Sequence, residues 1–186
     1  MTRFFEYLKA IRERALGAFL RIYLLLNGCR AGAGLRCAGL PHFRDIPKGN
    51  IRIGRRAAFG RGTVFEIART GHLVIGDRVT VSDNVRFSSA GPITVGHDCG
   101  IAENVSIRGS FHETARDRPF AVQGNVLREV TIGRDVLLGA GTVVLPGARL
   151  PDGVIIGALS RVGPRDKLRP YGIFAGSPLR HIRDRQ

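Results

Sequence analysis

Residues 130–163 read VTIGRDVLLGAGTVVLPGARLPDGVIIGALSRVG, and this stretch decides the fold. An aliphatic residue recurs at every sixth position, at Ile132, Leu138, Val144, Leu150, Ile156 and Val162. Four positions after these come further apolar or small residues, at Val136, Thr142, Ala148, Val154 and Ser160. A helix repeats near 3.6 residues and a strand near 2, so neither explains a period of six. Short strands joined by turns on successive faces of a prism do explain it, and the pattern predicts a β-helix.

The same period extends towards the N-terminus and is interrupted once. It begins near Ile53 and gives three regular hexads per coil, so we assign the repeat domain to residues 51–164. After Ile107 the period breaks, and it resumes only near Val130. Residues 113–129 are therefore predicted to leave the coil as a loop. Long loops in compact folds are uncommon and often functional, and His112 is the last residue before this one.

Residues 1–28 are predicted to form an amphipathic helix, because apolar residues recur at spacings of three or four: Phe4, Leu8, Ile11, Ala15, Phe19, Ile22 and Leu26. The polar side is basic and carries Arg3, Lys9, Arg12, Arg14 and Arg21. We favour packing of this helix on the main domain or on a neighbouring subunit. The alternative is a basic helix lying on an anionic membrane surface. Arg21 leaves the apolar run too short to span a bilayer.

Two segments flank the repeat domain. Residues 29–50 are rich in Gly, Pro and Arg without a clear period, which indicates a linker that contributes at most an irregular first strand. Residues 165–186 form a short basic tail in which a turn-rich strand precedes residues 179–186, for which a helix is one alternative.

The charge and the cysteine content indicate which classes of binding partner and which cellular compartment are expected. Lys and Arg number 29 against 15 acidic residues, giving a formal net charge of +14. This charge favours an anionic partner: nucleic acid, membrane, phosphorylated cofactor or acidic glycan. The chain has only three Tyr and no Trp for base stacking, which argues against nucleic acid. Three cysteines without paired spacing indicate a reducing compartment, so we expect a cytoplasmic protein. If the basic helix binds lipid, the protein would be peripheral at the inner face of the membrane.

Residues 51–183 resemble the hexapeptide-repeat acyltransferases. The resemblance rests on the hexads from Ile132 to Val162 and on the ending AGSPLRHIR at residues 175–183, which is similar to the family pattern A-G-x-P-x-x-x-I-R. Residues 75–112 and the position of the loop resemble the maltose and galactoside O-acetyltransferases. The N-terminal helix and short length are more similar to the colanic-acid and surface-polysaccharide acetyltransferases. The resemblance implies an all-β, left-handed parallel β-helix, a homotrimer, and acyl transfer from a CoA thioester.

The resemblance also implies catalytic residues. His112 falls where the family has its catalytic histidine, and imidazole suits a general base that deprotonates an alcohol near neutral pH. The sequence Phe111-His112-Glu113 departs from the Gly-His-Pro that relatives often have. Asn84 matches an asparagine near the acceptor site and is expected to bond the acceptor or the imidazole. Asn104 follows the same logic more weakly.

Acetyl-CoA is the expected cosubstrate, and the resemblance assigns its contacts. Backbone N–H groups near Gly139 and Ala140 would stabilise the oxyanion. Ala158 and Ser160 would follow the pantetheine arm, and Pro178 would stack on adenine. The phosphates would meet basic side chains, namely Arg165, Lys167, Arg180 and Arg183. In the family this groove lies between two subunits.

We therefore expect an acetyl-CoA-dependent O-acetyltransferase that acts on a sugar or glycan hydroxyl, in bacterial surface polysaccharide biosynthesis. N-acetylation of an amino sugar is an alternative, and serine acetylation is disfavoured because those enzymes carry a larger N-terminal domain. A non-catalytic scaffold or membrane-docked binding protein would keep the hexads without needing His112. No metal is expected, because a zinc site of the γ-carbonic-anhydrase type needs three close imidazoles, and His97 and His112 are fifteen residues apart.

Overall fold

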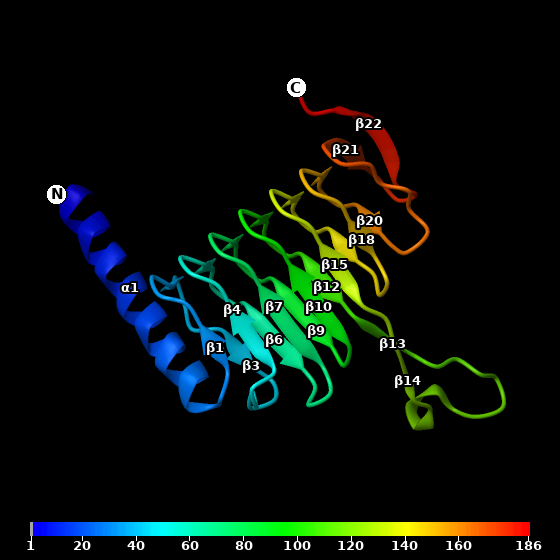
Figure 1. Cartoon of the computed structure of the whole chain (residues 1–186), viewed down its shortest axis with the longest axis horizontal. Helices are drawn as coiled ribbons and strands as arrows, with labels where there is room; N and C mark the ends of the chain where they lie inside the picture. The colour runs from blue at the N-terminus through cyan, green and yellow to red at the C-terminus, as the bar shows by residue number, and fades with distance from the viewer. Residues whose placement is uncertain (1) are drawn as a thin grey trace.

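Three sheets form the faces of a prism in the computed structural model, which describes residues 2–186 (Figure 1). Sheet A contains β1 (Arg30–Ala31), β4 (Ile51–Ile53), β7 (His72–Ile75), β10 (Pro92–Val95), β15 (Val130–Ile132) and β18 (Arg149–Leu150). Sheet B contains β2 (Arg36–Cys37), β5 (Ala58–Phe59), β8 (Thr80–Val81), β11 (Gly100–Ile101), β16 (Leu137–Leu138), β19 (Ile155–Ile156), β21 (Gly172–Ala175) and β22 (Arg180–Asp184). Sheet C contains β3 (His42–Phe43), β6 (Val64–Ile67), β9 (Arg86–Ser89), β12 (Ser106–Arg108), β17 (Val143–Val144) and β20 (Arg161–Val162).

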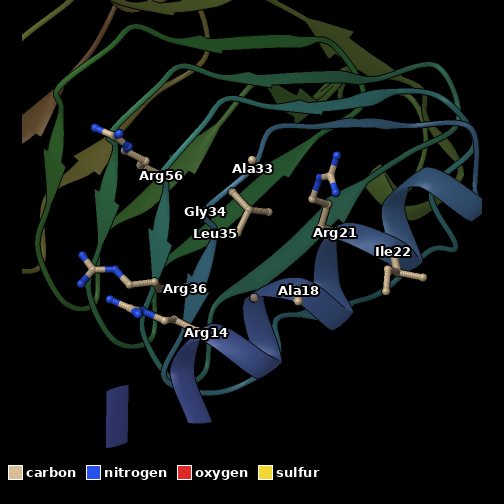
Figure 2. Close-up of a pocket in the computed structure, with 10 residues that line it drawn as sticks. Arg14, Ala18, Arg21, Ile22, Ala33, Gly34, Leu35, Arg36 and Arg56 are labelled. Atoms are coloured by element: carbon tan, nitrogen blue, oxygen red, sulfur yellow. The ribbon is translucent and has the colours of Figure 1, made fainter. Parts of the chain in front are cut away.

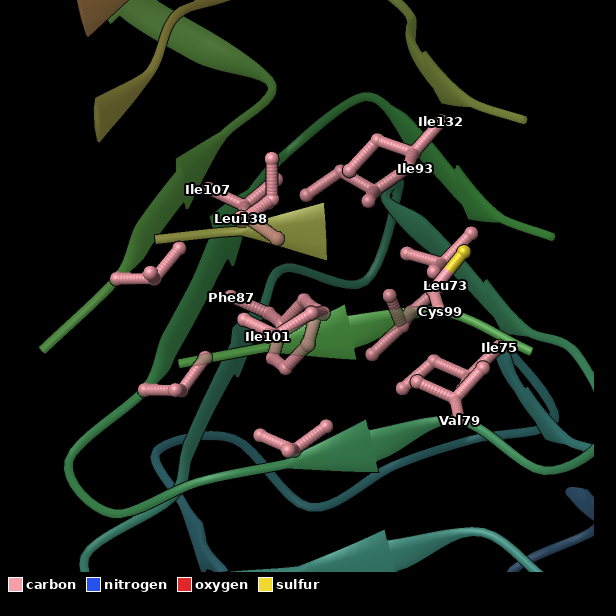
Figure 3. Close-up of a cluster of buried hydrophobic side chains, with 14 of the residues drawn as sticks. Leu73, Ile75, Val79, Phe87, Ile93, Cys99, Ile101, Ile107, Ile132 and Leu138 are labelled. Atoms are coloured by element: carbon pink, nitrogen blue, oxygen red, sulfur yellow. The ribbon is translucent and has the colours of Figure 1, made fainter. Parts of the chain in front are cut away.

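The chain visits sheets A, B and C in turn, and each coil stacks in parallel on the one before it. The left-handed parallel β-helix predicted from the period of six and the resemblance is confirmed. Both predicted inward positions are buried, as Leu138 and Val136 illustrate with 0% and 1% exposure. Residues at equivalent hexad positions stack in columns along the axis, so the core in Figure 3 is built coil by coil.

Residues 29–50 form the first coil, whereas the sequence analysis treats them as a linker. Their strands pair in register with the second coil, as Ala31 with Ile53, Cys37 with Phe59 and Phe43 with Phe65. The six-residue spacing is therefore present in this segment. It escapes notice because alanine, cysteine and phenylalanine occupy the hexad positions in place of isoleucine, leucine or valine. Burial raises the pKa of the Cys37 thiol to about 12.

Helix α1 (Thr2–Leu26) covers the open end of the first coil. Leu20 and Leu24 are buried against the solenoid. Gly17 lies against the backbone carbonyl of Leu35, where no Cβ would fit. Guanidinium groups of the helix supply donors to the first coil, since Arg12 Nη2 bonds Ala38 O at 2.8 Å. The helix thus protects an edge that would otherwise present unpaired backbone groups.

The apolar stripe predicted to pack on the main domain faces away from it. Its large members are 45–81% exposed: Phe4, Leu8, Ile11, Phe19, Ile22 and Leu26. The structure therefore contradicts packing of that stripe on the solenoid of its own chain. A second stripe takes its place, because Leu16, Gly17, Leu20 and Leu24 also recur at helical spacing, and only the glycine permits the close approach. Within residues 2–186, no helix has the length and apolarity needed to cross a membrane.

The predicted interruption and the C-terminal tail both contain strands. β13 (Ser110–His112) and β14 (Asn125–Leu127) pair as an antiparallel hairpin that projects from the prism, with the short helix η1 (Phe120–Val122) near its tip (Figure 1). In the tail, β22 folds back antiparallel on β21, so residues 180–184 form a strand and the helical alternative is wrong. β22 covers the last exposed strand of sheet B.

Gly17→Ala tests the helix contact. In a solvent-exposed helix this change stabilises by about 0.5–1 kcal/mol. Here the added Cβ meets backbone atoms of Leu35, so we expect destabilisation by about 1–3 kcal/mol. Denaturant unfolding measures the effect, and the exposed Ala10→Leu serves as a control with little expected change. A stabilised Gly17→Ala variant would show that the helix does not pack as described.

Candidate functional site

His112 lies at the base of the hairpin, at the end of β13. Its backbone pairs with Asn125 of β14, and its ring meets Phe120 edge-on, with ring centroids 5.8 Å apart. The side chain is exposed, so a substrate can reach it. The carboxylate of Glu113 lies beside Gly124, the residue that precedes β14.

A cleft of about 670 Å³ opens beside His112, between the hairpin and the outer face of sheet C. Polar and charged side chains dominate its lining, and Leu145 and Pro146 close one side. Glu66 bridges two arginines in it, with its oxygens 2.6 Å from Arg44 Nη1 and 3.1 Å from Arg86 Nη1. The cleft therefore offers hydrogen-bond donors and acceptors suited to a ligand with many hydroxyl groups.

The charged residues of this cleft were missed by the sequence analysis. Arg44, Glu66, Ser88 and Arg108 are spaced by 20 to 22 residues, which is one coil. Strand pairing stacks the last three on one face of sheet C, with Arg108 opposite Ser88 and Ser88 opposite Glu66. Aligning the outward positions of successive coils would have revealed the column.

Asn84 and Asn104 lie at the opposite ends of the sheet C strands, on the edge between sheets B and C. Both corners adopt left-handed backbone conformations, with φ of 58° and 59°, which asparagine tolerates better than most residues. They line a shallow polar hollow with Ser82, Asp83 and Glu103. The B/C edge thus gathers the two asparagines, while His112 lies beyond the C/A edge.

Gly139, Ala140 and Ala158 continue the B/C edge along the axis. Gly139 approaches the Ala158 backbone so closely that an added Cβ would lie 2.5 Å from its nitrogen. Within the described part of the chain, no acceptor bonds the backbone N–H of Ala140 or Ala158. The edge therefore presents free backbone donors in successive coils.

Ser160 plays a structural part at the same edge. Its side chain is buried, donates to Ala158 O at 3.3 Å and accepts the Gly176 N–H at 2.8 Å. The hydroxyl thereby ties the turn after β21 to the coil beneath it.

The residues predicted to contact the adenine and the phosphates are divided between the edges. Pro178 and Arg180 lie near the B/C edge, since Ser177 bonds Arg161 at the start of β20. Arg165 and Lys167 follow the other end of β20 and lie towards the C/A edge. Arg183 pairs with Ile173 further along β22. All of these side chains are exposed.

The third edge, between sheets A and B, is closed by ion pairs. Asp77 accepts the Arg55 backbone N–H at 2.7 Å, and this bond is the main reason that its pKa lies below the usual value. Asp152 repeats the arrangement with Arg134, with the same effect on its pKa. Among residues 2–186, no cluster of three or more His, Cys, Asp or Glu side chains could hold a metal ion.

A single chain therefore does not unite the predicted site. His112 and its cleft lie at the C/A edge. The free backbone donors lie at the B/C edge, across the width of sheet C.

The β-helix, the projecting hairpin and the histidine at its base define a class: the chain resembles the hexapeptide-repeat acyltransferases with a left-handed β-helix. No protein-family model matches the chain. WbbJ of Escherichia coli K12, which is assigned to lipopolysaccharide biosynthesis as an O-acetyl transferase, is 31% identical over 137 residues. That alignment covers 69% of this chain and 64% of WbbJ, so the chain spans less than two thirds of the relative.

Solved structures share the fold. AntD, an N-acyltransferase from Bacillus cereus in complex with dTDP and 3-hydroxybutyryl-CoA, superposes with a TM-score of 0.73 at 18% identity, over 88% of this chain and 87% of AntD. A galactoside acetyltransferase in complex with coenzyme A gives a TM-score of 0.58 at 19% identity, over 95% of this chain and 80% of that one.

Ser160→Ala tests the structural role of that hydroxyl. Removing it leaves the Gly176 N–H without its partner, so we expect a loss of about 1–3 kcal/mol in unfolding free energy. Ser106→Ala is the matched control, because the buried Ser106 Oγ has no hydrogen-bond partner among the described residues. We expect its effect to stay within about 0.5 kcal/mol. Equal effects in thermal or denaturant unfolding would contradict the assignment.

Proposed function

We propose that this protein transfers an acetyl group from acetyl-CoA to a sugar hydroxyl, during assembly of a bacterial surface polysaccharide in the cytoplasm. The observation that carries the proposal is the exposed His112 at the base of the extruded hairpin, facing a polar cleft on a hexapeptide β-helix. The similarity to WbbJ supports a glycan acceptor.

His112 would act as the general base. Its imidazole takes the proton of the acceptor hydroxyl as that oxygen attacks the thioester carbonyl carbon. The resulting tetrahedral intermediate carries its negative charge on the former carbonyl oxygen. Collapse breaks the carbon–sulfur bond, and the imidazolium returns the proton to the departing thiolate. The products are the acetyl ester and coenzyme A, with no acyl-enzyme.

The B/C edge would hold acetyl-CoA. The free N–H of Ala140 is a candidate oxyanion donor, and that of Ala158 a candidate partner for the pantetheine amides. Pro178 would contact adenine, and Arg180, with Arg183 further along β22, would serve the phosphates. Arg165 and Lys167 lie towards the C/A edge, so they would reach these phosphates from a neighbouring subunit. Asn84 would orient the acceptor on the same edge. The coenzyme A bound to the galactoside acetyltransferase of the same fold supports a CoA site.

The working form would be a homotrimer. The separation of His112 from the B/C edge supports this, because placing one chain's C/A edge against a neighbour's B/C edge would bring both parts together. Each active site would then use residues of two subunits.

An amino sugar is the second candidate acceptor. AntD, which shares the fold, is an N-acyltransferase. A neutral amine also loses a proton during attack, so His112 would keep its role. Assays with matched hydroxyl and amino acceptors would separate the two activities.

His112→Ala tests the catalytic assignment. We expect turnover to fall by about a hundredfold to ten-thousandfold, because the base is lost, while acetyl-CoA binding measured by calorimetry stays unchanged. The rate is measured as the release of coenzyme A, detected with a thiol reagent, in the presence of each sugar of a panel. The protein's own cysteines are buried, so they contribute little background reaction with the reagent. His72→Ala, at an exposed position on sheet A, is the matched control and is expected to retain activity.

Failure of the folded wild-type protein to bind acetyl-CoA would overturn the acyltransferase proposal and favour a non-catalytic scaffold. Full activity of the His112→Ala variant would overturn only the catalytic role of the histidine and would leave the acyltransferase proposal in place.

Mixing two inactive variants tests the shared site. Ala158→Trp would fill the proposed groove at an exposed position without disturbing the core. Co-refolding it with His112→Ala is expected to restore part of the wild-type activity, because some interfaces combine an intact histidine with an intact groove. Absence of recovery in co-assembled oligomers would place the whole site within one chain.

A further inference from the structure

A basic cleft of about 620 Å³ lies between α1 and the first two coils (Figure 2). Four arginines line it: Arg14, Arg21, Arg36 and Arg56. The lining contains no acidic side chain. Among the described residues, Arg14, Arg36 and Arg56 have no ion-pair partner. An uncompensated cluster of guanidinium groups favours phosphate-bearing ligands.

The outward apolar stripe of α1 borders this cleft directly. Ile22 lines the cleft and is also 55% exposed on the outer side of the helix. Along the stripe, Phe4, Leu8 and Ile11 extend the apolar surface, with exposures of 62%, 45% and 47%. A row of exposed, bulky apolar side chains marks a surface that binds a membrane or another protein.

Charge is distributed unevenly around the helix. Glu13 is turned towards the solenoid, with its side chain 20% exposed and close enough to Cys37 to raise the pKa of that thiol, although burial is the larger cause. Arg14 and Arg21 instead flank the stripe at the cleft. The outer side of α1 thus combines an apolar stripe with a basic border, the arrangement of helices that lie in a lipid interface.

We propose that α1 docks the protein on an anionic phospholipid surface. The stripe would enter the acyl boundary, and the arginine cleft would receive headgroup phosphates. A second copy of the chain is the competing occupant, and the four arginines of the cleft, with no acidic side chain among them, favour the anionic surface instead. The docking is independent of the proposed chemistry at His112.

Vesicle flotation of the full chain tests this proposal. One set of vesicles contains phosphatidylcholine and phosphatidylglycerol in equal parts, and the other contains phosphatidylcholine alone. We expect strong binding to the anionic set, weakened by high salt, and little binding to the neutral set.

Two paired variants separate the elements of the surface. Arg14→Gln with Arg36→Gln is expected to lower the partition coefficient about 30-fold, because each arginine near an anionic surface strengthens binding about fivefold. Its control, Arg69→Gln with Arg116→Gln, removes the same charge from exposed positions elsewhere and should have a clearly smaller effect. Ile11→Ser with Ile22→Ser is expected to lower partitioning at least about tenfold. Ile182→Ser, at an exposed position on β22 at the far end of the solenoid, should leave it unchanged.

If the cleft variant and its charge-matched control lose vesicle binding equally, the loss would reflect net charge alone, and the proposal would be overturned. A stripe variant that floats normally but changes its sedimentation coefficient would overturn it in favour of a second copy on that face. Because all the substituted side chains are exposed, circular dichroism is expected to show native folding throughout.

Discussion

The backbone hydrogen bonds between coils constrain everything else in this molecule. At the corner between sheets A and B, the N–H groups of Gly54, Gly76, Gly96 and Gly133 each donate to the next coil at 2.8 Å. A Cβ at any of these glycines would lie 2.5–2.7 Å from atoms of that coil. The close stacking of peptide groups therefore excludes a side chain at these four positions. It accounts for the glycine that follows the aliphatic residue at this corner, as in Ile53-Gly54 and Ile132-Gly133.

This constraint explains why much of the fold was predictable. Because each coil is hydrogen-bonded to the one before it, inward-facing residues recur at a fixed spacing along the chain. The period of six in residues 130–163 therefore specified a β-helix. The first coil was hidden because Ala31, Cys37 and Phe43 occupy these positions in place of isoleucine, leucine or valine. The helix was predicted, but its orientation was not, because two stripes have helical spacing and only Gly17 allows one of them to approach Leu35.

The candidate site was predictable in part. His112 stood out because it immediately precedes the interruption, and the structure shows it exposed beside a cleft. The arginines and Glu66 of that cleft are a coil apart in sequence, and only stacking brings them together. The placement of His112 and Ala158 on different edges follows from the path of the chain around the prism. No pattern in one chain specifies how a second copy would be arranged against it.

The hairpin leaves and rejoins the solenoid without altering its register. Its neck is closed where the Arg128 N–H bonds Gly109 O at 3.0 Å, and sheet A continues across the gap with Val95 paired to Ile132. The residues between these points are almost all exposed, so little of the core depends on them. A segment isolated in this way is free to diverge in length and composition while the scaffold stays fixed. In such an arrangement, substrate selectivity evolves through changes in the hairpin, and the stability of the β-helix does not limit how far the hairpin changes.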